Sequence, residues 1–412
     1  MWWLFFSTAW AIKLKELVVF ENSCILGERF TVAAVGDILL HGRLQKRAFS
    51  QKEHAVLWSE LIYRIEESDI AYANLEGPVA EGVARGGKIR KDPGPVFDDF
   101  IYSSFPQFNY HHSLIGSLLR SGFNVVSTSN NHSVDRASIG VDKTIDVLER
   151  HKMPFTGTRK KGETEQTRPW YTIVKQGNLT LTFLACTFST NGLSDPYHQV
   201  LMCHDPEDQA RMMSLIKAQA QKTDAVIVTP HWGEEYQTYP LRGDEKLGRA
   251  FLEAGALAVI GNHPHVVQPM ERIVTRDGRE TFIIYSIGNF VSGQGGVPKR
   301  TSLILYLGIT KNSKGTFLNG VRYTPTYMQS RPMHLWEPPV MHASRKHLRS
   351  ILHPDYLLEP HEELITNPKC TQLNKKYTTL TPRKRYRCSA QQKGKGQRGC
   401  TVSRRDPPKP FR

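Results

Sequence analysis

Five short polar clusters lie between residues 35 and 290, and each follows an apolar run rich in β-branched residues. Their side chains are carboxylates, amides and imidazoles, which are the ligands that proteins offer to hard and borderline divalent metals. In chain order the clusters are Gly36-Asp37, Asn74-Leu75-Glu76, Asn130-Asn131-His132, His231-Trp232-Gly233 and Gly261-Asn262-His263-Pro264-His265. The sequence therefore predicts a metal site built from residues that are far apart in the chain.

The elements around these clusters alternate between strands and helices. Apolar runs predict strands at 30–35, 70–73, 123–127, 225–228 and 258–260, and helical periodicity predicts helices at 55–67, 114–120, 139–150, 206–221 and 244–253. In open α/β sheets, ligands bind at the carboxyl ends of the strands. Because the clusters follow predicted strands, we expect them to meet at one edge.

Antiparallel strands are predicted as well. The turn Gln176-Gly177-Asn178 joins strands at 171–175 and 179–185 into a hairpin. Further antiparallel strands are predicted at 272–274, 282–286, 303–307 and 320–323. These patterns favour one α/β domain of catalytic size with a hairpin insertion.

The net charge of +15 is concentrated at one end of the chain. Residues 366–412 contain fourteen Lys and Arg and a single acid, Asp406, so they carry +13 of the +15. The remainder is nearly neutral, which excludes a generally basic surface. The tail has no apolar periodicity, so we expect it to be disordered. Its only aromatic residues are Tyr377, Tyr386 and Phe411, which argues against nucleic acid as its partner.

The cysteines and the N-terminus give information on the cellular compartment in which the protein is found. Six cysteines show no Cys-x-x-Cys spacing, so we expect isolated thiols, although export would permit disulfides. Residues 2–12 are apolar and end near Ala9-Trp10-Ala11, a pattern typical of signal-peptide cleavage, but no basic residue precedes them. This stretch is too short to span a bilayer, so it is either a degenerate signal peptide or a buried segment.

Each candidate ligand taken alone has a simpler explanation. An Asp after a strand is often a helix cap, and a lone His is usually a hydrogen-bonded core or surface residue. We interpret Trp232 and Tyr236 as packing residues. Glu234 and Glu235 are either solvated acids or groups that orient His231. The order of the clusters and their positions after strands are what favour a metal site.

Six motifs taken together resemble those of the bacterial CapA-type poly-γ-glutamate capsule synthesis proteins. They are Ala34-Val35-Gly36-Asp37, Ala73-Asn74-Leu75-Glu76-Gly77, Ser129-Asn130-Asn131-His132, Pro230-His231-Trp232-Gly233, Gly261-Asn262-His263-Pro264-His265 and Tyr285-Ser286-Ile287-Gly288-Asn289-Phe290. The resemblance implies the fold of the calcineurin-like metallophosphoesterases, which is a four-layer α/β/β/α sandwich with two metals at the strand ends. Ser286 to Phe290 we interpret as a turn that holds the site.

On this basis we divide the chain into four parts. Residues 1–29 form an N-terminal segment, and residues 30–330 form the domain with the metallophosphatase-like fold. Residues 331–365 are a C-terminal extension, and residues 366–412 are the basic tail.

The resemblance also implies roles for the site residues. Six residues would bind two divalent metals, which are Mn, Zn or Fe: Asp37 and His265 the first, Asn131, His231 and His263 the second, and Glu76 both. His132 would be an unligated imidazole that stabilises or protonates the leaving oxygen, and water activated by the metals would be the nucleophile.

Two features near the first metal depart from this scheme or add to it. Metallophosphoesterases have an Asp-x-His motif, whereas Ile38 and Leu39 follow Asp37 here. Either His41 reaches the first metal from the following turn, or that site is one ligand short. Three of the cations in the loop after Glu76 are either solvated or hold an anionic substrate, namely Arg85, Lys88 and Arg90.

Two classes of function fit these features. The first is a metal-dependent hydrolase of the metallophosphoesterase type, and the second is a non-catalytic assembly factor that binds a polyanion. The resemblance implies a location in the cell envelope outside the cytoplasm, with an anionic polymer such as poly-γ-glutamate and capsule synthesis proteins as partners. The basic tail would suit a membrane or cell-wall surface.

Overall fold

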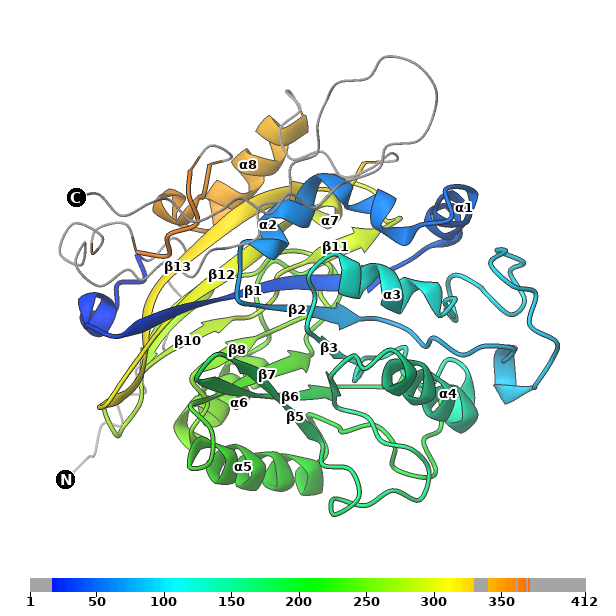
Figure 1. The fold of residues 1–412 in the computed structure, drawn as a ribbon, viewed down its shortest axis with the longest axis horizontal. Helices are drawn as coiled ribbons and strands as arrows, with labels where there is room; N and C mark the ends of the chain where they lie inside the picture. Colours follow the sequence, from blue (N-terminus) through cyan, green and yellow to red (C-terminus); the bar gives the residue numbers. More distant parts are fainter. Residues whose placement is uncertain (1–16, 330–339, 360–361, 368–369, 371–412) are drawn as a thin grey trace, which may run out of the picture.

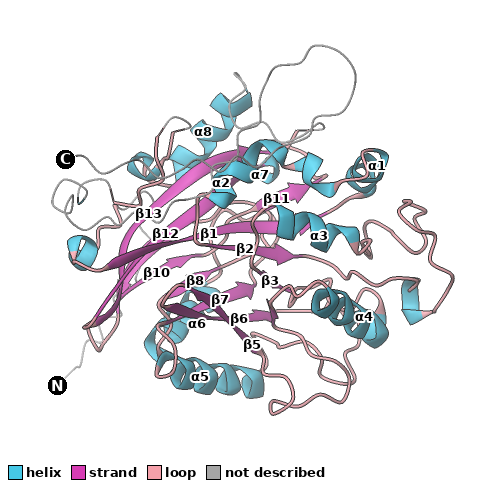
Figure 2. Cartoon of the chain, viewed as in Figure 1, coloured by secondary structure: helices cyan, strands magenta, loops and turns pink. Residues whose placement is uncertain are grey.

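Two β-sheets pack face to face, with helices on the outer side of each (Figures 1 and 2). The structure is a computed structural model that describes residues 17–329, 340–359, 362–367 and 370. The first sheet has the order β13-β12-β1-β2-β3-β4, with β11 also paired to β1, and the second has the order β5-β6-β7-β8-β10-β9.

The strands and helices have the following bounds. The strands are β1 (Glu28–Leu39), β2 (Ile70–Leu75), β3 (Val125–Ser127), β4 (Phe155–Thr156), β5 (Tyr171–Gln176), β6 (Leu179–Thr187), β7 (Ala225–His231), β8 (Ala258–Ile260), β9 (Met270–Val274), β10 (Glu280–Ile284), β11 (Asn289–Ser292), β12 (Thr301–Asn312) and β13 (Gly315–Tyr327). The α-helices are α1 (Gly42–Ser50), α2 (Ile62–Glu66), α3 (Ser113–Arg120), α4 (Ala137–Arg150), α5 (Pro206–Ala220), α6 (Arg242–Ala254), α7 (Val297–Arg300) and α8 (Val340–Ile351). The 3-10 helices are η1 (Glu21–Cys24), η2 (His54–Leu57), η3 (Ser59–Leu61), η4 (Arg85–Gly87) and η5 (Pro354–Tyr356).

Three hydrophobic clusters separate the four layers. Between the sheets, Val32 and Tyr72 of the first sheet meet residues of the second, and Tyr72 stacks on Phe183 with ring centroids 6.0 Å apart. Val35 belongs to the cluster that the first sheet forms with α1 and α3. The second sheet forms its outer cluster with α5 and α6, where Phe251 is buried. The predicted four-layer α/β/β/α sandwich is therefore confirmed.

A bulge in β1 directs Asp37 away from the outer cluster. Along a regular strand, side chains alternate between the two faces, so Asp37 would share the outer face with Val35. The register with β2 shifts between Val35, which pairs with Ala73, and Asp37, which pairs with Asn74. Gly36 is thus an extra residue, and Ile38 lies in the outer cluster instead.

One predicted helix is wrong. Residues 55–67 form two 3-10 turns, η2 and η3, before the short helix α2. Trp58 interrupts the helix with a φ of −138°, and its indole Nε1 donates a hydrogen bond to Ser121 Oγ at 2.8 Å. Burial of this large side chain outweighs the helical periodicity of the segment. The structure also contains α1, which the sequence analysis did not predict.

The expectation of isolated thiols is wrong for four cysteines. Cys186 is bonded to Cys203, and Cys24 to Cys370, with Cα–Cα distances of 5.1 Å in both pairs. The partners of the second pair are 346 residues apart, so spacing in the sequence gave no indication of it. Cys388 and Cys400, the basic tail from residue 371 onward, and residues 1–16 lie outside the described residues.

The segments that flank the domain pack against it where they are described. Val18 and Phe20 are buried in the cluster between the sheets, and so are Leu348 and Ile351 of α8. Arg64 of α2 donates hydrogen bonds to the backbone oxygens of Glu359 and Glu362 in the extension. Among the described helices, none is long and apolar enough to cross a membrane.

Candidate metal centre

The six predicted ligands meet at one place, although they come from both sheets. Asp37 lies in the bulge of β1, Glu76 directly follows β2, and His231 is the last residue of β7. Asn131 lies in the loop after β3, and the remaining two, His263 and His265, lie in the loop after β8. All six are at most 3% exposed. The parallel strands deliver them because their carboxyl ends meet at one edge of the sandwich.

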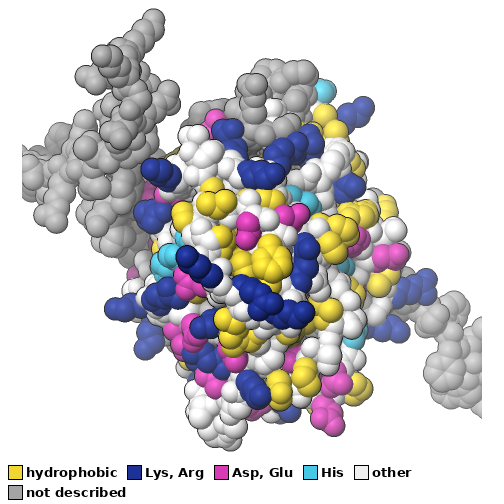
Figure 3. All heavy atoms as spheres, turned by 90° about the vertical axis from the view of Figure 1, so that its right-hand side faces the viewer, with side chains coloured by type: hydrophobic (Ala, Val, Ile, Leu, Met, Phe, Trp, Pro, Cys, Tyr) yellow, Lys and Arg dark blue, Asp and Glu magenta, His cyan; other side chains and the backbone are white. Residues whose placement is uncertain are grey.

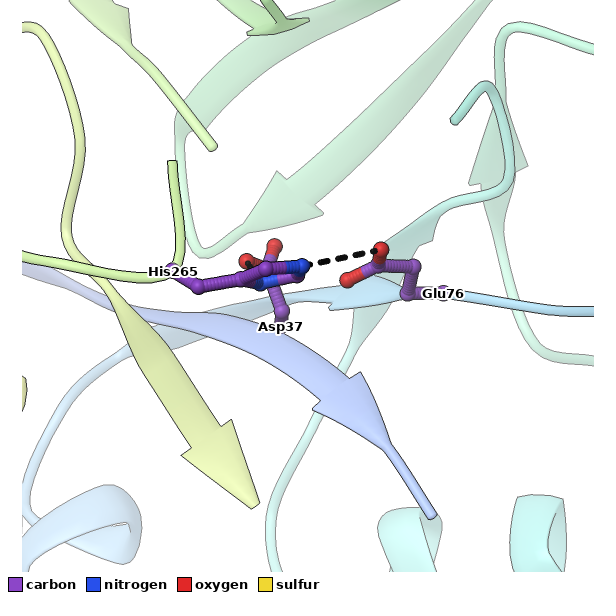
Figure 4. Close-up of side chains that lie close together, drawn as sticks. All are labelled: Asp37, Glu76 and His265. Carbon is purple, nitrogen blue, oxygen red and sulfur yellow. Dashed lines mark hydrogen bonds and ion pairs between the residues drawn. The ribbon is translucent and has the colours of Figure 1, made fainter. Parts of the chain in front are cut away.

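The first group consists of Asp37, His265 and Glu76 (Figure 4). The Nδ1 atom of His265 lies 3.0 Å from Asp37 Oδ2, and its Nε2 atom lies 3.9 Å from Glu76 Oε1. One ligand atom from each of the three residues lies within 4.8 Å of the others, which is the spacing of a group that could hold a metal ion. An imidazole between two carboxylates is a donor set suited to borderline divalent ions.

The second group converges on Nε2 of His231. This nitrogen lies 3.0 Å from Asn131 Oδ1, 3.2 Å from His263 Nδ1 and 3.7 Å from Glu76 Oε1. Two nitrogens bound to one tetrahedral zinc are roughly 3.4 Å apart, so the spacing of the two imidazoles suits a shared ion. Burial lowers the pKa of His231 and of His263, so both rings are held neutral, as ligands must be.

Glu76 lies between the two groups. Neither of its buried carboxylate oxygens has a hydrogen-bond partner in the part of the chain that the structure describes. Burial raises the pKa of Glu76, and the negative charges of Asp37 and Glu235 raise it further. A buried carboxylate without partners is costly, and a bound cation is the group that would compensate it. The residues present therefore fit a divalent metal site.

Asn74 connects the two groups. Its Nδ2 atom donates a hydrogen bond to Asp37 Oδ1 at 2.8 Å and lies 3.1 Å from His231 Nδ1. Ser127 Oγ in turn donates to Asn74 Oδ1 at 3.2 Å, which fixes the amide. With Nδ1 of His231 engaged in this way, its Nε2 is the nitrogen that faces the metal groups.

His132 lies beside the site and is oriented by a carboxylate. Its Nδ1 atom is 2.8 Å from Asp135 Oδ2, which also accepts a hydrogen bond from the backbone N–H of Phe108 at 2.6 Å. The Phe108 ring contacts His132 edge-on with centroids 4.8 Å apart. This arrangement leaves Nε2 of His132 as the nitrogen that is free to exchange a proton.

Glycines in two motifs are required by close approaches of the backbone. A Cβ atom at Gly36 would lie 1.8 Å from the carbonyl oxygen of Gly288, and one at Gly261 would lie 1.8 Å from that of Tyr285. Asp37 N–H donates to the same Gly288 oxygen at 3.2 Å. The segment from Ser286 onward thus supports the site as predicted, and it continues into β11 from Asn289.

The four remaining predicted residues do not belong to either group of ligands. They are His41, Arg85, Lys88 and Arg90. His41 is not part of the group that could hold a metal; its Nδ1 contacts Leu39 O and Gly293 N, each at 3.1 Å. Arg85 lies 3.6 Å from Asp99, and Lys88 and Arg90 are exposed on the same loop. No contact between these three cations and the six ligands is present among the described residues.

Four further residues lie at the site: Asn191 and Asp135 were not named in the sequence analysis, Asn74 belonged to a cluster without a role of its own, and Glu235 was one of two acids considered for orienting His231. Asn191 Oδ1 accepts a hydrogen bond from Asn131 Nδ2 at 3.2 Å, which turns the amide oxygen of Asn131 toward His231. Asp135 and Asn74 orient His132 and His231 as described above. Glu235 lies 3.9 Å from His265, rather than beside His231. Asn74 and Glu235 lie in or beside predicted motifs, and Asp135 follows His132 by three residues, whereas Asn191 carried no sequence signal.

Trp232 and Tyr236, the first two aromatic residues that follow His231, differ in their exposure to solvent. Trp232 is fully buried and its indole donates to Tyr285 O at 2.9 Å, which agrees with a packing role. Tyr236 is 46% exposed, and the ammonium of Lys299 lies 4.4 Å from the centre of its ring. Its ring also contacts that of His265, with centroids 6.1 Å apart, so Tyr236 packs with one part of its surface and is exposed with the rest.

Comparison with known families identifies the group to which this chain is related. The model of the family described as bacterial capsule synthesis protein PGA_cap matches residues 31–294, which is more than half of the chain and includes all six candidate ligands. The chain belongs to the PGA_cap family. The resemblance that the motifs indicated is thereby confirmed.

Two PGA_cap relatives are similar over most of this chain. The PGA biosynthesis protein CapA of Bacillus subtilis (strain 168) is 28% identical over 318 residues, which cover 76% of each protein. The capsule biosynthesis protein CapA of Bacillus anthracis is 25% identical over 290 residues, which cover 69% of this chain and 65% of the relative.

Among solved structures, the chain is similar to phosphoesterases at low identity. The calcineurin-like phosphoesterase YfkN from Bacillus subtilis is 14% identical, with a TM-score of 0.44 over 79% of this chain and 98% of that one. The NAD nucleotidase NadN of Haemophilus influenzae is 11% identical, with a TM-score of 0.46 over 85% of this chain and 67% of that one. At these values the likeness carries no argument about activity.

Proposed function

We propose that this PGA_cap protein is a metal-dependent hydrolase of the metallophosphoesterase type that acts in the synthesis or export of an anionic capsule polymer. The observation that carries the proposal is Glu76: its two buried oxygens have no hydrogen-bond partner among the described residues, and its Oε1 lies 3.7 Å from His231 and 3.9 Å from His265. A protein that only needed the fold would not retain this costly carboxylate. The names of the two CapA relatives support the link to capsule synthesis.

Metals held by the two groups would supply the electrophilic part of the chemistry. Asp37 and His265 would hold the first ion, Asn131, His231 and His263 the second, and Glu76 would contact both. A divalent ion in such a site polarises the oxygen of a phosphoryl or carbonyl group and activates water. Mn, Zn and Fe all accept carboxylate, amide and imidazole ligands.

The protein's own residues would orient the site and move protons. Asn74 holds Asp37 and His231 in place, and Asn191 turns Asn131 toward the second ion. His132 would donate a proton from Nε2 to the leaving oxygen, because Asp135 holds its Nδ1. Phe108 shields one side of the His132 ring from water.

An anionic polymer such as poly-γ-glutamate is the partner that charge favours. On the face shown in Figure 3, Lys and Arg side chains, interspersed with acids, surround a group of hydrophobic side chains. The +13 charge of residues 366–412 would add affinity for a polyanion or for a membrane or cell-wall surface. The two disulfides support a location outside the cytoplasm, where thiols oxidise.

The alternative is an assembly factor that binds the polymer without cleaving it. The basic tail favours it, because fourteen cations would bind a polyanion without any metal. The buried, unpartnered Glu76 favours the hydrolase, since binding a polyanion gives no reason to bury a carboxylate.

The test is the metal content of the purified protein together with its activity. Wild-type protein, Glu76→Ala and His231→Ala are reconstituted with Mn or Zn and analysed for bound metal. Hydrolysis of an aryl phosphodiester is then measured, with His132→Ala as a further variant. We expect stoichiometric metal in the wild type and its loss in the first two variants. His132→Ala should keep its metal and lose about 10²- to 10⁴-fold in turnover. A wild type that binds no metal after reconstitution would refute the proposal.

A further inference from the structure

Glu235 is a carboxylate that faces the first group from the solvent side. It lies in the loop after β7, and its Oε1 atom is 3.9 Å from His265 Nε2. The same nitrogen is 3.9 Å from Glu76 Oε1. Two carboxylates therefore approach one imidazole nitrogen at equal distance. Neither buried oxygen of Glu76 has a hydrogen-bond partner among the residues that the structure describes, and a cation in this space would compensate them.

These distances suit ligands of one ion. Zinc binds imidazole nitrogen and carboxylate oxygen at about 2.0–2.2 Å, so two ligands of the same ion are at most roughly 4.4 Å apart. Both 3.9 Å separations fall within that limit. An ion beside His265 Nε2 would therefore lie within reach of both carboxylates.

The backbone around Glu235 is fixed in an unusual conformation. Tyr236, the next residue, has a φ of +67°, and its N–H donates to Pro264 O at 2.8 Å. His265 has a φ of +59°. Non-glycine residues are uncommon in this region, and they persist where the surrounding structure imposes it. The bond between the two loops thus sets the position of Glu235 relative to His265.

The first group needs a further ligand from outside the Asp37 motif. Leu39 occupies the position at which the histidine of an Asp-x-His motif would stand, and it is buried in the outer hydrophobic cluster together with Ile38. His41, the nearest imidazole in the sequence, has its Nδ1 engaged by the backbone of Leu39 and Gly293. Glu235 is the side chain that already lies beside His265.

We propose that Glu235 is a ligand of the first metal and takes the place of the missing histidine. This inference rests on the proposed metal site and specifies its composition. Asp37, Glu76 and Glu235 would make the first site rich in carboxylate oxygen, whereas Asn131, His231 and His263 make the second rich in nitrogen. Oxygen ligands suit Mn²⁺, and imidazoles suit Zn²⁺. The first site therefore favours Mn²⁺ relative to the second.

In the experiment, the metal-free, full-length protein is titrated with Mn²⁺. The concentration of the free ion is measured at each step by electron paramagnetic resonance. The variants are Glu235→Gln, Glu235→Asp and His41→Gln. Glu234→Gln is the matched control, because Glu234 is the exposed acid next in the chain. Thermal unfolding of each metal-free variant checks that it is folded.

We expect the wild type to bind Mn²⁺ at two sites of different affinity. Glu235→Gln should weaken one of them tenfold or more and leave the other unchanged, and Glu235→Asp should lie between. Glu234→Gln and His41→Gln should bind like the wild type.

Two results would overturn the inference. If the Glu235→Gln variant binds Mn²⁺ at both sites with wild-type affinity, Glu235 is not a ligand. The same holds if its affinity is equally weakened at both sites. In either case the proposed function stands. If His41→Gln instead loses one ion, His41 is the missing ligand. A wild type that binds neither Mn²⁺ nor Zn²⁺ would remove the proposed function as well, so the two failures are distinguishable.

Discussion

Single amide and carboxylate groups determine how the ligands of this site are oriented. Asn74 contacts Asp37 and His231 at once, and Asp135 contacts His132. Groups of this kind fix which nitrogen of a histidine faces the metal or the substrate. Their removal should therefore change binding and turnover in different ways.

Asn74→Ala should weaken metal binding about 10- to 100-fold, since neither Asp37 nor His231 would then be held in position. Unfolding in urea should show a loss of about 1–3 kcal/mol, because buried polar atoms lose their partner. The control is Asn178→Ala, which alters an exposed amide in the turn between β5 and β6. Unchanged metal affinity in Asn74→Ala would show that Asp37 and His231 keep their orientation without Asn74.

Asp135→Asn should lower turnover about 10- to 100-fold, with bound metal and KM unchanged, because the amide no longer favours the protonated Nδ1 of His132. The pH profile of turnover should shift as well, which a purely structural role would not cause. Asp142→Asn, on the half-exposed side of α4, is the control. Loss of metal in Asp135→Asn would place His132 among the ligands instead.

The residue types at the site could be predicted from the sequence, but their partners could not. Asp37, Glu76, Asn131, His231, His263 and His265 each follow a predicted strand. Glu235 and Asn191 lie in loops whose conformation depends on other loops, as the bond from Tyr236 to Pro264 shows. Local patterns contain no information about such contacts.

At the level of elements, the bulge in β1 and the loops after β3, β7 and β8 form the site. The parallel strands of both sheets were predicted because their apolar runs are buried on both faces. The helix expected at 55–67 was wrong because Trp58 is buried against α3, where its indole reaches Ser121. This contact is tertiary and has no periodic signature.

The η2 segment should make the domain sensitive to acid. His54 is 2% exposed, and its Nε2 has no hydrogen-bond partner among the described residues. Burial and the charge of His111 together lower its pKa from 6.5 to about 4, while Glu53 opposes the shift. Because the unfolded chain binds the proton more tightly, stability is fully present above pH 6.5 and is lost as the pH falls toward 4.

Urea unfolding at pH 7 and pH 5 should show part of this loss, which is about 2 kcal/mol between these two pH values for His54. His54→Gln should lose less stability between the two pH values than the wild type. His353→Gln, in the C-terminal extension, should behave like the wild type. If His54→Gln and the wild type lose the same stability between pH 7 and pH 5, His54 is not the source of the acid sensitivity.

The bond between Cys186 and Cys203 should stabilise the end of β6. The two residues are 17 apart, and a closed loop of this size is worth about 3 kcal/mol through the entropy of the unfolded chain. The double variant Cys186→Ala/Cys203→Ala should lose roughly this amount in urea unfolding. The control is Cys388→Ala/Cys400→Ala in the tail. Equal stability of both double variants would show that the bond is unimportant or does not form.

At the scale of the whole molecule, a nearly neutral domain carries a strongly basic tail. The family and the four layers could be predicted from the resemblance of the six motifs, and the order of the clusters after strands predicted that they meet. The bond between Cys24 and Cys370 could not be predicted, because chain proximity at a separation of 346 residues is a property of the finished fold.

Removal of residues 371–412 should weaken binding to poly-γ-glutamate and make the affinity less dependent on salt, because screening acts on exposed charges. Metal binding should be unaffected. Fluorescence anisotropy of a labelled polymer at 50 and 300 mM salt measures both effects. A variant with its tail Lys and Arg changed to Gln separates charge from length. Full affinity without the tail would place polymer recognition on the domain itself.

The bond between Cys24 and Cys370 has a consequence for the integrity of the protein. It joins the segment before β1 to Cys370, which lies near the start of the basic tail, so the chain between them is a covalently closed ring. A single proteolytic cut in an exposed loop, such as the one that contains Phe105, would open the ring without releasing a fragment. The basic tail would stay attached to the cleaved domain. In an extracellular environment rich in proteases, a molecule cut once in this way would keep its two pieces linked until the disulfide is reduced.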